Sequence, residues 1–312
     1  MTVYPDFYVI GAPKAGTTSL HHYLSQHPEL SLPVTRKEPG YLHFLSGEPS
    51  FSTGPTQCRE YAADAYRRKH RISTTSPEEY EAVWSDDSDL LRGEVTPSYL
   101  QDPEVSAVLA RLRPDAKLIV ILREPLERAY SDFLMNRRLG TEPIEDFSEA
   151  VAAEESCPRY FWGARSYLYA SAYATHLTRW LRMFDPAQFS FNLFEDLAGQ
   201  SETLLDRLFD FLGVSQFRIE PGRARNPNLD LKSSPLVRLY TSQSPLKEPL
   251  RRVIPSGLRD RVWKRIQERA PEIIAPPLDP EVKIRLRERF RPGVLELETI
   301  LGRKLDAWIT SE

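Results

Sequence analysis

The sequence predicts an α/β fold, in which a central and mostly parallel sheet is flanked by helices. Residues 116–122 form a continuous apolar run between turn residues, which is typical of a central parallel strand covered on both faces. Residues 7–10 form a second buried strand, which runs through a glycine-containing turn into a helix that opens near 17–19. Such strand–turn–helix units, in 312 residues of which 41% are apolar, predict one large domain over 1–312.

The composition limits the class of protein. A net charge of −3 with mixed signs provides no overall field that would favour nucleic acid. The two cysteines, Cys58 and Cys157, fit a reducing compartment better than a disulfide scaffold, and the Cys and His spacings predict no metal site. No apolar run is long enough to span a membrane, and the early first strand leaves no room for a targeting segment. We therefore expect a cytoplasmic protein.

The turn after the first strand has the residues of an anion-binding loop. Gly11 and Gly16 permit backbone conformations in which successive amides face inward. The following helix adds unpaired N–H groups and a partial positive charge. Lys14 supplies a full positive charge, and Thr17 and Thr18 supply hydroxyl donors. These residues predict a phosphate-binding turn rather than an ordinary strand–helix turn.

This turn differs from the loop of nucleotide triphosphatases. That motif reads G-x-x-x-x-G-K-[ST], with the lysine directly after the second glycine. Here Thr17 stands in that place and Lys14 lies between the glycines. A lysine at this position can reach the bridging or terminal oxygens of a short phosphate-type group.

The string G-A-P-K-A-G-T-T-S-L at 11–20 resembles the 5′-phosphosulfate loop of sulfotransferases that use 3′-phosphoadenosine-5′-phosphosulfate (PAPS). It is similar to the heparan-sulfate-type branch and its soluble bacterial relatives. The resemblance implies a P-loop-like sulfotransferase fold and PAPS as the cofactor, which leaves as 3′,5′-adenosine bisphosphate. It also implies that the 5′-phosphosulfate is held by Lys14, Ala15, Gly16, Thr17, Thr18 and Ser19.

A helix over about 17–26 and a short strand over 30–32 come next, followed by Lys37-Glu38 and the aromatic stretch 41–44. The resembled family has a Lys-Glu pair and an aromatic segment here. Lys37 is expected either to reach the transferred group or to be a solvated loop lysine, and the sequence favours neither.

Residues 45–92 form a polar, irregular excursion that we expect on the substrate side. Its basic run at 67–71 is most simply a solvated surface. Ser76, Pro77 and Glu79 predict a helix start with a capping box.

Glu94 lies at the end of a strand predicted over 90–95, where open α/β sheets place ligands. Residues 94–99 match the pattern E-x-T-P-x-Y, and the resemblance implies that Glu94 is the general base that deprotonates the acceptor hydroxyl. A surface or capping glutamate is the simpler alternative. Val95 replaces a lysine that is frequent in the resembled branch.

The strand over 116–122 ends in a pattern that matches R-[DE]-P-x-x-R-x-x-S. An arginine can grip a phosphate with two hydrogen bonds, and a serine on the following helix can add a third. The resemblance implies that Arg123 and Ser131 hold the 3′-phosphate of PAPS. Arg128 is expected on the helix surface or in a salt bridge.

The rest of the chain completes the predicted domain. We expect a short acidic helix start at 146–155, an acceptor-channel segment at 159–162, an amphipathic helix over 169–184 with its apolar stripe in the core, a strand over 189–193, a helix over 202–212 capped by Gly213, and closing helices within 280–308. The loop 218–235 is expected to close over the adenine and phosphates, with Arg223 and Arg225 as binding residues.

The predicted reaction moves the sulfuryl group from PAPS to a hydroxyl of a carbohydrate, a lipid-like alcohol or a secondary metabolite. Glu94 would take the acceptor proton, Lys14 would neutralise the leaving 5′-phosphate, and no metal is required. One alternative is a P-loop small-molecule kinase that uses ATP and magnesium. Another is a catalytically silent PAPS- or nucleotide-binding module, which is favoured if Glu94 faces away from the sulfate position.

Overall fold

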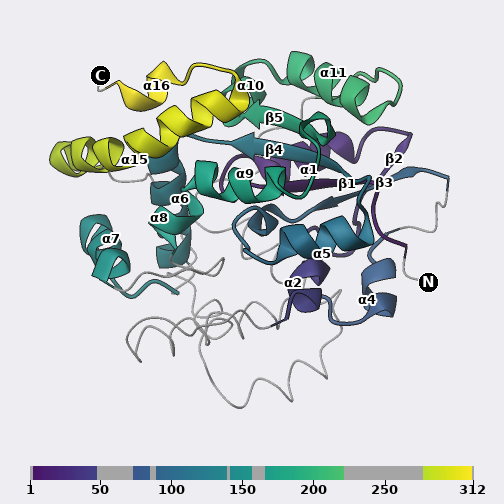
Figure 1. Cartoon of the computed structure of the whole chain (residues 1–312), viewed down its shortest axis with the longest axis horizontal. Coiled ribbons are helices and arrows are strands. Elements are labelled where there is room, and N and C mark those ends of the chain that lie inside the picture. The colour runs from purple at the N-terminus through teal and green to yellow at the C-terminus, as the bar shows by residue number, and fades with distance from the viewer. Residues whose placement is uncertain are drawn as a thin grey trace.

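A computed structural model describes residues 3–47, 73–84, 89–138, 141–156, 166–220 and 277–310 (Figure 1). Its sheet has the order β2-β3-β1-β4-β5, and every neighbouring pair is parallel. The strands are β1 (Phe7–Gly11), β2 (Leu30–Ser31), β3 (Leu91–Val95), β4 (Lys117–Leu122) and β5 (Phe189–Leu193). The predicted α/β fold with a parallel sheet is therefore confirmed.

The two strands that the sequence marks as most apolar lie at the centre of the sheet. Every residue of β1 is buried, and only Lys117 of β4 is partly exposed. Both strands have a hydrogen-bonded neighbour on each side and helices over their faces, so no position in them favours a polar side chain. This placement is the physical reason that β4 reads as a continuous apolar run.

Helices cover both faces of the sheet. The crossover from β1 to β2 and the crossover from β3 to β4 run in opposite directions, and right-handed connections then place α1 and α5 on opposite faces (Figure 1). The helical segments are α1 (Thr17–Leu24), α2 (Tyr41–Leu45), α4 (Pro77–Glu81), η1 (Pro97–Tyr99), α5 (Val105–Leu112), α6 (Pro125–Arg138), α7 (Phe147–Ser156), α8 (Tyr167–Ala170), α9 (Tyr173–Leu181), η2 (Pro186–Gln188), α10 (Phe194–Gly199), α11 (Ser201–Leu212), α15 (Pro280–Leu301) and α16 (Asp306–Ile309).

The amphipathic helix predicted over 169–184 is two helices. Its stripe is buried as expected, with Tyr173 and Trp180 in the core. The chain breaks between α8 and α9 at Ser171, whose hydroxyl donates to the Pro125 carbonyl and accepts a hydrogen bond from Arg128. These bonds tie the break to α6, so a tertiary contact interrupts a helix that the periodicity alone would continue.

Part of the excursion over 45–92 is described. Ser76 accepts a hydrogen bond from the Glu79 amide, which confirms the predicted N-cap of α4. The reciprocal bond differs, because the Glu79 carboxylate accepts from the Thr75 amide instead of that of Ser76. The basic run at 67–71 lies outside the described residues.

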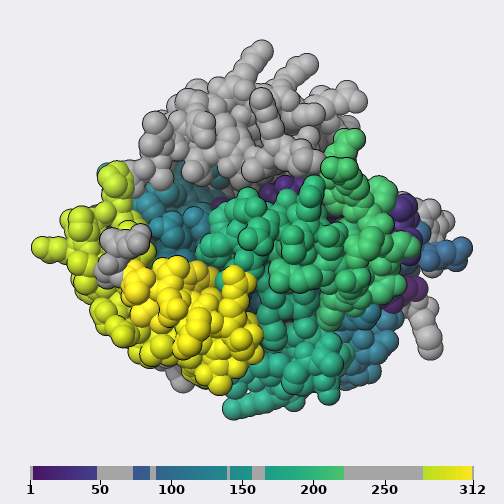
Figure 2. All heavy atoms as spheres, turned by 90° about the horizontal axis from the view of Figure 1, so that it is seen from above, coloured from purple at the N-terminus to yellow at the C-terminus, as the bar shows by residue number. Residues whose placement is uncertain are grey.

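The C-terminal helices return to the body of the domain. Leu305 and Trp308 join the main hydrophobic core, and the Trp308 indole donates to Glu195 at 3.3 Å. Figure 2 shows these helices, in lime and yellow, on the same face as the green segments that include α11. No helix in the described ranges combines the length and the apolar character that crossing a bilayer requires.

The arrangement of the sheet brings three connections to one edge. Because β1, β3 and β4 are parallel neighbours, their carboxyl ends lie at the same edge. The loop 11–16 and Arg123 follow the ends of β1 and β4, and residues 94–96 include the end of β3. The edge where open α/β sheets bind ligands is therefore also where the sequence motifs meet.

Candidate active site

The loop between β1 and α1 has the shape of an anion cradle. Gly16 is the N-cap of α1 and has a φ of 83°, and a Cβ atom there would lie 2.9 Å from the Phe194 ring. The first amides of α1, at Thr17 and the two residues after it, have no intrahelical acceptor. The backbone therefore offers donors to a bound anion at the point where the helix dipole favours one.

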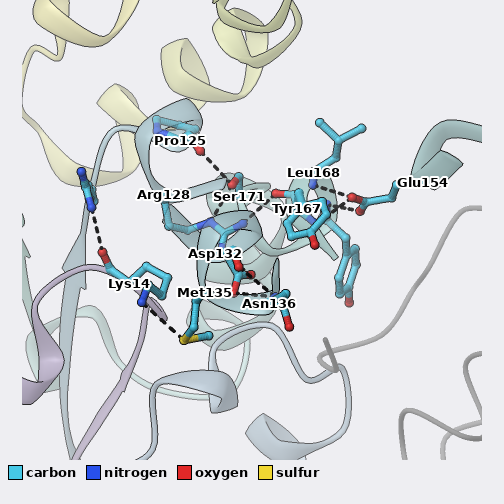
Figure 3. A network of polar contacts seen from close by, with 12 residues as sticks. Lys14, Pro125, Arg128, Asp132, Met135, Asn136, Glu154, Tyr167, Leu168 and Ser171 are labelled. Carbon is cyan, nitrogen blue, oxygen red and sulfur yellow. Dashed lines mark hydrogen bonds and ion pairs between the residues drawn. The ribbon is translucent and has the colours of Figure 1, made fainter. Parts of the chain in front are cut away.

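Lys14 lies in this loop with its amine turned toward α6. Its Nζ atom is 3.4 Å from the Met135 sulfur, a weak acceptor (Figure 3). Burial lowers the pKa of Lys14, the nearby Asp132 opposes this effect, and the surrounding arginines reinforce it. A largely desolvated ammonium whose direct contact is a thioether would gain from an arriving anion.

Arg123 follows β4 and contacts the loop. Its Nη1 atom lies 3.5 Å from the Lys14 carbonyl oxygen, and its Nη2 atom lies 3.3 Å from a Glu127 carboxylate oxygen. The guanidinium also lies 5.0 Å from the centre of the Phe194 ring, within cation–π range. With about a quarter of its side chain exposed, Arg123 is held beside the loop and remains accessible.

Ser131 lies on the same face of α6 as Met135, one turn away, so it faces the loop that carries Lys14. Its hydroxyl makes no hydrogen bond with the part of the chain that the structure describes, and the residue is partly exposed. Lys14, Arg123 and Ser131 therefore border one region, and their roles in phosphate binding remain predictions.

Arg128 lies on the buried side of α6. The side chain has no exposed surface, so the surface alternative is wrong, while its ion pair with Asp132 at 3.2 Å fits the salt-bridge alternative. Arg128 also donates to Ser171 at 2.7 Å and to the Tyr167 carbonyl at 2.8 Å (Figure 3). It holds α6 against α8, which fixes the helix that carries Ser131.

Lys37 reaches the opposite side of the loop. Its Nζ atom donates to the Thr18 hydroxyl at 2.9 Å and pairs with Glu38 at 3.1 Å. A quarter of the Lys37 side chain is exposed, so both predicted alternatives for this lysine remain predictions. Lys37 stands at the N-terminus of α1 and Glu38 stands next to it with nearly half of its side chain exposed.

Glu94 is fully buried, although the resemblance implied a general base. One carboxylate oxygen accepts hydrogen bonds from Thr96 and Tyr99, the other accepts one from Tyr80, and all three distances are 2.6 Å. Burial raises the pKa of Glu94, and the three hydroxyl donors counteract that rise. A base must reach the proton that it removes, and in this structure Glu94 faces only the core.

The sequence motifs missed two features of the site. The motifs give Glu38 no role beyond its place in a Lys-Glu pair. The signal that could have identified it is its position directly after Lys37, the residue that contacts Thr18 of α1. Phe194, which packs on Arg123, directly follows β5 and carried no motif. Arg223 and Arg225 lie outside the described residues, as do Cys58, Cys157 and residues 159–162.

Carboxylates and histidines do not cluster as a metal site in the described ranges: no group of three or more His, Cys, Asp or Glu side chains could hold an ion.

Comparisons with known proteins identify relatives of the chain. Human carbohydrate sulfotransferase 15 is 27% identical over 250 residues, which span 67% of this chain and 44% of the human protein. The human bifunctional heparan sulfate N-deacetylase/N-sulfotransferase 3 is 29% identical over 214 residues, which span 67% of this chain and 22% of that protein. The chain therefore spans less than half the length of these relatives.

The fold also has a solved counterpart. The crystal structure of a sulfotransferase from Alicyclobacillus acidocaldarius superposes with a TM-score of 0.70 over 99% of this chain and 100% of that chain, at 24% identity. A profile of the sulfotransferase family matches residues 5–218. Since this match covers more than half of the 312 residues, the chain belongs to the sulfotransferase family.

Proposed function

We propose that this protein transfers the sulfuryl group of PAPS to a hydroxyl group of its acceptor. The observation that carries the proposal is that two cationic side chains, those of Lys14 and Arg123, lie at the ends of neighbouring strands. Lys14 follows β1, Arg123 follows β4, and the Arg123 guanidinium contacts the Lys14 carbonyl at 3.5 Å. PAPS has two separate anionic groups: Lys14 suits its 5′-phosphosulfate and Arg123 suits its 3′-phosphate.

The chain's own groups match the charges that such a transfer moves. The acceptor oxygen forms a bond to sulfur, the bond from sulfur to the 5′-phosphate oxygen breaks, and the acceptor proton passes to a carboxylate. Negative charge then grows on the leaving phosphate, where the amides at the start of α1 and the Lys14 ammonium would stabilise it. Lys37, on Thr18, adds a second cation at the same helix end.

We propose Glu38 as the general base in place of Glu94. Glu38 is about half exposed and lies one contact away from Thr18, through Lys37. Glu94 has no exposed surface and already accepts hydrogen bonds from three hydroxyl groups. Reaching an acceptor would require Glu94 to break all three bonds, whereas Glu38 would only exchange an exposed ion pair, which is worth little.

The acceptor class that we propose is a carbohydrate. The two human relatives are named for carbohydrate and heparan sulfate, and each match spans 67% of this chain. Lipid-like alcohols and secondary metabolites are the other outcomes that an acceptor panel separates.

The silent binding module is the second candidate, and the burial of Glu94 is the observation that favours it. It shares the PAPS site but lacks transfer. The kinase alternative differs in the ligand itself, because it requires ATP with magnesium.

The nucleotide specificity is tested by calorimetry of the full chain with 3′,5′-adenosine bisphosphate and, separately, with ATP and magnesium. We expect the bisphosphate to bind, and Arg123→Ala to weaken it by about 10- to 100-fold, because a charge-assisted contact to phosphate is lost. Arg291→Ala is the matched control, since that arginine is half exposed and pairs with Glu288 of its own helix α15. Binding of ATP with magnesium alone would overturn the proposal.

Transfer is tested with radiolabelled PAPS and a panel of unsulfated glycans, aliphatic alcohols and phenols. Labelled glycan supports the proposed acceptor class. A labelled alcohol or phenol supports the proposed transfer activity but shows that the acceptor is an alcohol or a phenol and not a carbohydrate. Binding of the bisphosphate without transfer to any member of the panel favours the silent module.

A further inference from the structure

Residues 37–42 form a strap with two different ends. At one end, Lys37 and Glu38 are partly exposed and lie beside Thr18 of α1. At the other end, from Pro39 onward, the chain is buried, and Leu42 has no exposed surface. The exposed end is short enough that its position depends on how firmly the buried end is held.

Hydrogen bonds from two sides hold the buried end of the strap. The Pro39 carbonyl accepts a bond from the Thr74 amide at 2.8 Å. The Leu42 amide donates to the Tyr99 hydroxyl at 3.1 Å, and that hydroxyl donates in turn to Glu94 at 2.6 Å. Glu94 therefore lies directly beneath the strap.

The Glu94 carboxylate sets the direction of this network. Its bonds from Tyr80, Thr96 and Tyr99 have the 2.6 Å length of hydroxyl groups that donate to an ionised carboxylate. Because the Tyr99 hydroxyl donates its hydrogen bond to Glu94, its oxygen is left to accept a hydrogen bond from the Leu42 amide. A glutamine at 94 would place an amide donor against hydroxyl groups that now donate.

We infer that Glu94 is a positioning residue, which acts through Tyr99 and the strap to hold Lys37 and Glu38 at the N-terminus of α1. Tyr80 and Thr96 complete the set, since they bring α4 and the end of β3 onto the same carboxylate. The inference rests on the proposed function for its catalytic meaning, but the placement of Lys37 can be measured without any transfer.

The experiment is trace acylation of the full chain with acetic anhydride, followed by mass spectrometry of each lysine. In the wild type, the bond to Thr18 slows modification of Lys37. In Glu94→Gln and in Tyr99→Phe, we expect Lys37 to react at least about threefold faster, because the strap opens more often. Tyr41→Phe is the matched control, since it removes a hydroxyl group from the strap that bonds to no described residue.

Two other lysines of the same chain serve as internal controls, which distinguish a loss of Lys37 positioning from a general loss of stability. Lys304 is mostly exposed, and Lys117 is bound to the Phe211 and Leu212 carbonyls at the amino end of β4. The inference requires Lys37 to change relative to both. Equal acceleration of Lys37 and Lys117 with a lower melting temperature would reduce Glu94 to a structural residue and overturn the inference, and so would unchanged labelling of Lys37.

Binding measurements keep the two proposals apart. Glu94→Gln should retain affinity for 3′,5′-adenosine bisphosphate within about threefold, because neither Lys14 nor Arg123, the proposed phosphate-binding residues, contacts Glu94. If the wild type fails to bind the bisphosphate, the proposed function fails, while the labelling result still decides the placement of the strap. If Glu94→Gln fails to fold, Tyr99→Phe carries the same test.

Discussion

The end of β3 and the ends of β1 and β4 share one edge of the sheet but treat their polar groups in opposite ways. At β3, Glu94 is fully buried and accepts hydrogen bonds from three hydroxyl groups. At β1 and β4, the Lys14 amine contacts the Met135 thioether, and Arg123 keeps part of its surface in solvent. We call the first region sealed, because its carboxylate is buried and hydrogen-bonded, and we call the second region open, because Arg123 remains partly exposed.

We propose that this difference, rather than position along a strand, distinguishes a structural site from a binding site. A polar group whose hydrogen bonds are complete gains little from a ligand, whereas a desolvated cation without a strong acceptor gains much. Both regions carry motif residues at strand ends, so the motif alone cannot rank them.

The comparison is tested most strongly by removing one carboxylate from each region. Glu38→Gln should lower sulfate transfer from PAPS to the glycan panel by about 10²–10⁴-fold, because the general base is lost. It should also abolish the rise in rate with increasing pH, since a base acts only when ionised. Glu94→Gln should lower the rate less and keep that rise. The measurement is the pH profile of radiolabel transfer.

The opposite pair of results would restore the prediction made for Glu94. If Glu94→Gln removes the rise with pH and Glu38→Gln retains it, the sealed carboxylate opens during turnover and acts as the base. Unchanged affinity for 3′,5′-adenosine bisphosphate in both variants is the control that both still fold around the donor site.

A second prediction concerns the sealed side of α6. Arg128→Ala should destabilise the fold by about 3–5 kcal/mol, because Asp132 and the Tyr167 carbonyl lose the partner of a buried network. Arg289→Ala removes an ion pair of which both members are largely exposed, and should cost about 0–1 kcal/mol. Urea unfolding of the two variants measures the contrast, and equal losses would contradict it.

The smallest expected effect concerns Glu124, which follows Arg123 and accepts a hydrogen bond from the Glu127 amide at the start of α6. Burial raises the pKa of Glu124 from 4.5 to about 7. A carboxyl with a raised pKa binds its proton more tightly in the folded state, so its contribution is complete below about pH 4.5 and is lost as the pH rises to about 7. The loss is about 3 kcal/mol at most.

Glu124→Gln should remove this slope while its amide oxygen still accepts the helix-capping bond. Urea unfolding at about pH 5 and about pH 8 measures the slope. Glu104→Gln, at an exposed position, is the control and should leave the slope of the wild type unchanged. A slope that persists in Glu124→Gln would show that this carboxyl is not the source.

Local chemistry was enough to predict much of the molecule. The apolar run at 116–122 requires burial on both faces, so it predicts the central strand β4. Gly16, with a φ of 83°, and the residues of α1 build the strand–helix turn and its helix N-terminus within one short stretch. Arg123 directly follows β4 and Ser131 lies on α6, the next helix along the chain, so the two motif residues come from consecutive elements.

Contacts between distant segments decided the remaining features. Whether Glu94 is open or sealed depends on Tyr80, which reaches it from α4, and on Tyr99, which also bonds the strap. The break at Ser171 depends on Arg128 of another helix, which no helical periodicity records. A strand end tells where a side chain begins, but the packing around it decides whether its hydrogen bonds are already complete, and with them whether a ligand is needed.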